Sequence, residues 1–146
     1  MALVPKDNKF AEKVRESFAR QPVMAFIGAE LLKIEAGEVD IGLPYRNDLT
    51  QQNGFLHAGI TAAIIDSACG YAAFSLMPAG SDVLTAEFKI NLLSPALGDY
   101  YLAEGRILKA GKTLTVARGD VFAVREDEKK LIATLLSTIV CVRQKR

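Results

Sequence analysis

The second half of the chain alternates apolar and polar residues with a period of two, the pattern of β-strands that have one covered face. In the first of these runs the apolar positions are Leu84, Ala86, Phe88, Ile90 and Leu92. Further strands are expected at residues 99–109, 113–125 and 129–142, with turns at 110–112 and 126–128. The pattern therefore predicts a meander of long antiparallel strands.

The first part of the chain predicts an amphipathic helix followed by a hairpin. The helix is indicated by apolar residues at helical spacing, Phe10, Val14 and Phe18. We expect Asp7 or Asn8 to cap it, Pro22 to mark its end, and its apolar side to pack on a sheet edge. Strand-like runs at residues 27–34 and 39–43 then predict the hairpin.

A polar loop, residues 44–53, leads into an apolar run that predicts a helix beginning near His57, the only histidine of the chain. The run contains a single charged residue, Asp66, and a buried carboxylate costs several kcal/mol unless it is paired, neutralised or used. Residues 55–77 could just cross a bilayer, but an Asp at the midpoint costs about 2.5–3.5 kcal/mol. A buried helix of a soluble domain is favoured.

A helix that is apolar on nearly all sides must be covered nearly all round, and a strongly curved antiparallel sheet can do this. We therefore predict an α+β hotdog fold, in which about six strands wrap a long central helix. The chain shows no internal repeat, linker or low-complexity tract, so residues 1–146 are predicted to form one domain, with residues 1–24 as an N-terminal helical extension.

Composition narrows the function classes. The 146 residues are 50% hydrophobic and carry a net charge of +1, which provides no overall field for nucleic acid or an anionic membrane. Two cysteines, Cys69 and Cys141, make no disulfide framework, and no apolar leader follows the start, so we expect a cytoplasmic protein. One histidine and two distant cysteines predict no metal site, and we expect no cofactor.

The start of the apolar helix carries a motif. The chain has Gln51-Gln52-Asn53-Gly54-Phe55-Leu56-His57-Ala58-Gly59, with Asp66 nine positions after His57. This order resembles the signature of hotdog acyl-CoA thioesterases of the phenylacetate-degradation (PaaI-like) type. Thr85, Ser94-Pro95-Ala96 and the Gly111-Lys112-Thr113 turn also resemble segments of that family, over residues 27–140. The family has Gly where this chain has Ala58; alanine keeps the backbone N–H and adds a methyl group.

The resemblance implies hydrolysis of an acyl-CoA thioester to free acid and coenzyme A, by dimers that often pair into tetramers. The candidate catalytic residues are Asp66, His57, Ala58, Gln51 and Thr85. The candidate substrate-binding residues are Gly59, Asn53, Lys89, Gly111 and Lys112. Of these, the lysines could meet the phosphates of coenzyme A.

The residues themselves suggest how such a site works. The first N–H groups of a helix lack internal partners, so the Ala58-Gly59 end is a candidate oxyanion site. Asp66 could attack the thioester carbonyl directly or deprotonate a water molecule. His57 and Asp66 are about 13 Å apart along one helix. We therefore expect two composite sites per dimer, with Gln51, His57 and Ala58 from one subunit and Asp66 and Thr85 from the other.

Other interpretations stay open at this point. His57 could simply cap the helix, Asp66 could be a structural buried acid, and Cys69 is expected to pack in the core. Two alternative functions are a hotdog acyl-thioester dehydratase or hydratase and a non-catalytic acyl-CoA-binding module. The acyl group, and whether coenzyme A or a carrier protein bears it, are also open, although several apolar residues could line a pocket: Phe55, Tyr71, Phe74 and Met77.

Overall fold

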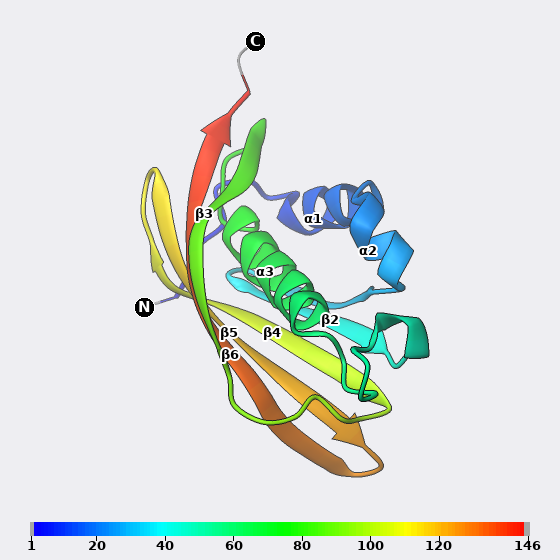
Figure 1. Ribbon diagram of the computed structural model, residues 1–146. Coiled ribbons are helices and arrows are strands. Elements are labelled where there is room, and N and C mark those ends of the chain that lie inside the picture. Colours follow the sequence, from blue (N-terminus) through cyan, green and yellow to red (C-terminus); the bar gives the residue numbers. More distant parts are fainter. Residues whose placement is uncertain (1, 145–146) are drawn as a thin grey trace.

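The computed structural model describes residues 2–144 and shows a curved antiparallel sheet around one long helix (Figure 1). The strands are β1 (Glu30–Glu35), β2 (Glu38–Pro44), β3 (Ser81–Leu92), β4 (Tyr100–Ala110), β5 (Leu114–Arg125) and β6 (Glu128–Arg143). The helices are α1 (Phe10–Ala19), α2 (Pro22–Ile27), the short 3-10 helix η1 (Asn47–Leu49) and α3 (Ala58–Phe74). The predicted arrangement of six strands around a central helix is confirmed.

The strands follow the order β1-β2-β4-β5-β6-β3 in one sheet, and every neighbouring pair is antiparallel. Strands β4, β5 and β6 form the predicted meander. The expectation that the meander begins with β3 is wrong, because the chain crosses from β3 to β4 and leaves β3 at the far edge beside β6. Consequently, β3 has one free edge, and β1 has the other.

The N-terminal helices cover the end of the sheet beside β1. Helix α1 packs on β1 and α3, as expected for its apolar side, with Val14 fully buried. Two boundaries differ from the prediction. No side chain caps α1, although the Asp7 carboxylate accepts a hydrogen bond from the N–H of Lys9. Pro22 opens α2, so the first strand starts at Glu30 and not at residue 27.

Strand β3 contains a bulge that changes which side chains face the helix. The sequence predicted one covered face made of Leu84, Ala86, Phe88, Ile90 and Leu92. In the structure Thr85 lies opposite Ile139 and Phe88 opposite Ser137, so the bulge at Ala86 shifts the alternation by one residue. The predicted single face is therefore wrong, because Leu84 lies on the opposite face from Phe88 and is 62% exposed.

Two glycines let α3 lie directly on the sheet. Gly105 of β4 and Gly119 of β5 are paired across the ladder beneath the helix. A Cβ atom at Gly105 would come within 2.5 Å of the backbone of Ala68, and one at Gly119 within 2.3 Å of the Ile65 side chain. The contact at Gly105 is impossible without moving α3, because it meets backbone atoms, whereas the contact at Gly119 requires the Ile65 and Cys69 side chains to shift. The paired glycines therefore set the height of the helix above the strands.

Replacing Gly105 with Ala tests this contact. The methyl group would meet backbone atoms of α3, which cannot rotate away, so we expect Gly105→Ala to lower the free energy of unfolding by about 1–3 kcal/mol. Gly70→Ala on α3 is the control, because its Cβ would meet nothing within 4 Å. That variant should gain up to ~1 kcal/mol from helix propensity. Urea unfolding followed by circular dichroism measures both, and equal stabilities would contradict the close-approach account.

Candidate active site

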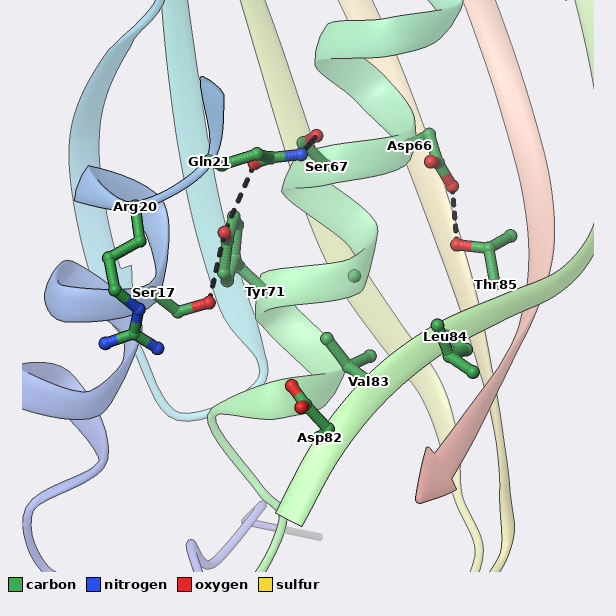
Figure 2. Close-up of a pocket in the computed structure, with 11 residues that line it drawn as sticks. Ser17, Arg20, Gln21, Asp66, Ser67, Tyr71, Asp82, Val83, Leu84 and Thr85 are labelled. Atoms are coloured by element: carbon green, nitrogen blue, oxygen red, sulfur yellow. Dashed lines mark hydrogen bonds between the residues drawn. The ribbon is translucent and has the colours of Figure 1, made fainter. Parts of the chain in front are cut away.

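Asp66 lies on the third turn of α3 and faces the bulged strand β3 (Figure 2). The Thr85 hydroxyl donates a hydrogen bond of 2.7 Å to Asp66 Oδ1, and the carboxylate is half-buried. Thr85 immediately precedes the bulge at Ala86, so the distortion of β3 sits beside this contact. Burial raises the pKa of Asp66 above its ordinary value, and the Thr85 hydrogen bond partly opposes that rise.

An open cavity of about 460 Å³ lies in front of Asp66. One wall is β3, from Asp82 to Thr85, and another is the face of α3 that carries Asp66 and Gly70. The third wall comes from the end of α1 and the residues that follow it: Ser17, Arg20 and Gln21. Figure 2 shows the Ser17 and Gln21 side chains turned toward α3. The cavity thus places an ionisable carboxylate where a small molecule could reach it.

The side chain of His57 caps the N-terminus of α3. The His57 imidazole accepts a hydrogen bond of 2.8 Å from the N–H of Gly59 through Nδ1, so His57 is the N-cap of the helix. The expectation that His57 could act as a cap is therefore met. Because the Gly59 N–H is engaged, the Ala58 N–H is the free donor at this exposed helix end within residues 2–144.

Gln51 belongs to a tight loop that precedes α3. Its backbone N–H donates to the carbonyl of Phe55 at 2.8 Å, and its side-chain Oε1 accepts from the N–H of Asn53. Gln51 and Ala58 both line a second cavity of about 430 Å³, whose wall is mostly apolar and includes Leu92. This cavity brings together the amide side chain and the helix end that the sequence placed in one half of a site.

The two halves do not meet within one chain. Ala58 and Asp66 are eight residues apart on α3, which corresponds to about 12 Å along the helix axis. They line different cavities, with Thr85 beside Asp66 and Gln51 beside Ala58. A single carbonyl carbon cannot contact both ends at once.

The remaining predicted substrate-binding residues are scattered. Asn53 is exposed beside Gln51, and Gly59 forms part of the helix cap. Lys89 lies opposite Leu136 on the outer face of the sheet, away from α3. Gly111 and Lys112 line a third cavity, which also contains the last turn of α3. None of these last three residues lies at either half of the candidate site in this chain.

The sequence predicted Tyr71 as a pocket-lining residue, but three polar residues bonded to one another and to Tyr71 beside the Asp66 cavity were missed: Ser17, Gln21 and Ser67. Tyr71 donates to Gln21 Oε1 at 3.2 Å, and its hydroxyl lies 3.3 Å from that of Ser17. Gln21 Nε2 donates to the Ser67 hydroxyl at 3.3 Å. Ser67 follows Asp66 directly and could have been noted. No sequence motif around Gln21 or Ser17 indicates a site, because only the packing of α1 on α3 brings these residues to the cavity.

The thiol of Cys69 is buried in the core, as expected. Burial raises the pKa of the Cys69 thiol to about 12, which suits a packing role. Within residues 2–144 no group of His, Cys, Asp and Glu side chains could hold a metal ion. No helix in that range is long and apolar enough to span a membrane.

Together, the curved sheet, the enclosed helix and the carboxylate on that helix define a hotdog-fold protein with a candidate hydrolytic site. The chain belongs to the Thioesterase superfamily, whose family model matches residues 53–130. A protein of Saccharolobus solfataricus provisionally named an esterase is 33% identical over 132 residues, which are 90% of this chain and 85% of that protein. Another from the same organism is 33% identical over 94 residues, and the match spans 64% of this chain and 66% of that protein, just under two thirds.

Solved structures show the same fold. A thioesterase family protein from Silicibacter pomeroyi is 50% identical, with a TM-score of 0.91 over 92% of this chain and 99% of that one. The PaaI protein of the phenylacetic acid degradation operon of Escherichia coli is 17% identical, with a TM-score of 0.82 over 92% and 94% of the two chains. The predicted membership of the hotdog thioesterases is thereby confirmed at the level of the family.

The raised pKa of Asp66 predicts a pH-dependent cost to stability. The folded chain holds this proton more tightly than the unfolded chain, so stability falls as pH rises from the unfolded pKa, about 3.9, through the higher folded pKa. Asp66→Asn removes the charge and keeps an acceptor for Thr85. We expect the variant to be more stable than the wild type at pH 7 and this advantage to fade near pH 4. Urea unfolding across this range measures the difference, and a less stable variant at pH 7 would contradict the account.

Proposed function

We propose that the protein hydrolyses an acyl-CoA thioester to the free acid and coenzyme A, at a site completed by a second subunit. The observation that carries this proposal is Asp66. Among residues 2–144 it forms no ion pair, accepts one side-chain hydrogen bond from Thr85, and faces an open cavity despite the cost of its burial. A carboxylate retained at such a cost and left accessible is suited to act on a substrate.

The second subunit follows from the distance between the two halves. If two copies pair with their α3 helices antiparallel, the Ala58 end of one helix comes beside Asp66 of the other. The free edge of β3 supports such pairing, since its exposed apolar side chains include Phe88 at 42% and Leu92 at 56% exposure. Two equivalent sites would then form per dimer, and dimers could pair further into tetramers.

The chemistry would divide between the two halves. The Ala58 N–H, at the positive end of the α3 dipole, would donate to the thioester oxygen as negative charge develops there. Asp66 would either add to the carbonyl carbon, releasing the coenzyme A thiolate and leaving an anhydride that water cleaves, or take a proton from a water molecule that adds to the same carbon. Both routes consume one water and need Asp66 ionised. We therefore expect activity to rise with pH through the raised pKa of Asp66.

The state of His57 favours hydrolysis over dehydration. A dehydratase would need a basic nitrogen to remove a proton from the acyl chain. Here Nδ1 already accepts from the Gly59 N–H, which leaves Nε2 as the protonated nitrogen of the neutral ring and hence a donor. His57 would then hold the helix start in place and not move protons.

The positive charge around Lys112 is suited to the phosphate groups of coenzyme A. This residue lines a cavity of about 410 Å³ together with Lys6 and Arg143, and three cations around one hollow are suited to bind phosphates. The resemblance implies coenzyme A as the carrier of the acyl group, and this cluster adds support to it. Lys89, on the outer face, would take no part.

Substitution of Asp66 tests the proposal directly. Asp66→Asn should lower kcat/KM for acyl-CoA hydrolysis by about 10²–10⁴-fold, while the protein stays folded. A loss of less than about tenfold, ~1.4 kcal/mol of barrier, would remove Asp66 from the chemistry. Asp120→Asn is the matched control, because Asp120 accepts from the Thr134 hydroxyl at 2.7 Å, the same distance as in the Thr85–Asp66 pair.

The Ala58 N–H can be removed without disturbing the helix. Ala58 is the first residue of α3, where proline is well tolerated, and His57 has the extended backbone (φ −59°, ψ 135°) that a following proline requires. Ala58→Pro should lower kcat by about 10²–10³-fold. Ala58→Gly keeps the N–H and should exceed the proline variant by at least about tenfold. Equal rates for the two would show that this N–H is not the oxyanion donor.

A further inference from the structure

Gly70 leaves an open space beside the candidate catalytic carboxylate. It lies four residues after Asp66, so both residues occupy one face of α3, and both line the same cavity. A glycine inside a helix costs about 1 kcal/mol relative to alanine. Unlike Gly105 and Gly119, Gly70 has no neighbour within 4 Å of its Cβ position, so packing does not require it. The missing side chain extends the cavity along the helix.

The cavity becomes polar on the side of α3 that faces the N-terminal helices, where Ser67 and Tyr71 flank Gly70 in the sequence. Tyr71, Gln21 and Ser67 are joined by hydrogen bonds of 3.2–3.3 Å, which are long for hydroxyl and amide groups. The Tyr71 proton is used toward Gln21, and Gln21 donates one of its two N–H protons to Ser67. One N–H of Gln21 and the O–H of Ser67 have no acceptor among residues 2–144. Figure 2 shows these side chains gathered between α1 and α3.

We propose that this region is the acyl pocket, with Gly70 setting its length and Gln21 selecting acyl groups that carry a hydrogen-bonding substituent at the far end. The inference rests on the proposed thioesterase function, because it assumes that the reacting carbonyl lies at Asp66. The acyl body then crosses α3 over Gly70, and a hydroxyl or carbonyl at its end accepts from Gln21. The long hydrogen bonds of the cluster can be exchanged for bonds to the substrate at little cost.

Two variants separate length selection from polar selection. Gly70→Leu fills the space along the helix. Gln21→Met keeps the size of the side chain and removes its amide. We would measure kcat/KM of both variants and the wild type on acetyl-CoA, on a series of straight-chain acyl-CoAs, and on the ω-hydroxy acyl-CoAs of the same lengths. Acetyl-CoA is the reference substrate, because its acyl group ends at a methyl and has no chain to cross α3.

The wild type should prefer the hydroxy acyl-CoA at the length that reaches Gln21, and Gln21→Met should lower that preference by about tenfold. Gly70→Leu should lower kcat/KM for the longer chains by at least about tenfold relative to acetyl-CoA. Unchanged selectivity in both variants, or a loss uniform across all acyl groups, would overturn the acyl-pocket assignment and leave the thioesterase function standing. A wild type that hydrolyses none of these thioesters would overturn the proposed function itself.

Discussion

The direct contact of α3 with two paired glycines determines the rest of this molecule. Gly105 and Gly119 hold the backbone of Ala68 and the side chain of Ile65 against the middle of the sheet. These contacts place Ile65, Ala68 and Cys69 on the side of α3 that lies against the sheet. Asp66 lies on the adjacent face of α3 and points toward β3, in a cavity that residues of the N-terminal helices also line. The position of the candidate carboxylate is thus a consequence of two absent side chains on other strands.

The burial of Asp66 on α3 lowers the stability of the folded chain when the carboxylate is charged. Burial raises the pKa of Asp66, and only the Thr85 hydroxyl opposes this rise. A protein selected for stability alone would place an apolar side chain at such a position. In the proposed dimer, the Ala58 N–H of the second copy would donate to the carbonyl that Asp66 would attack, directly or through water. Under that proposal, the stability of one chain and the activity of the pair would favour different residues at position 66.

Much of the fold could be predicted from the sequence, because it rests on local periodicity. The strands from residue 99 onward alternate over most of their length, with register shifts in the β4–β5 and β5–β6 ladders. The lone charge of Asp66 in an apolar run indicated both the central helix and the candidate site. The position of β3 beside β6 and the bulge at Ala86 could not be predicted, since strand order and register depend on the partner strand. Gln21 was missed for a related reason: it reaches the cavity only through the packing of α1 on α3.

The central claim is that one site needs two chains, and a mixed dimer tests it most directly. Asp66→Asn and Ala58→Pro subunits with different affinity tags can be produced together, and the dimer that carries both tags can be isolated. In that dimer one site combines the intact Ala58 end with the intact Asp66, while the other site has lost both. The account predicts about half of the wild-type activity per dimer, although each parent variant is nearly inactive. A mixed dimer as inactive as its parents would contradict the shared site.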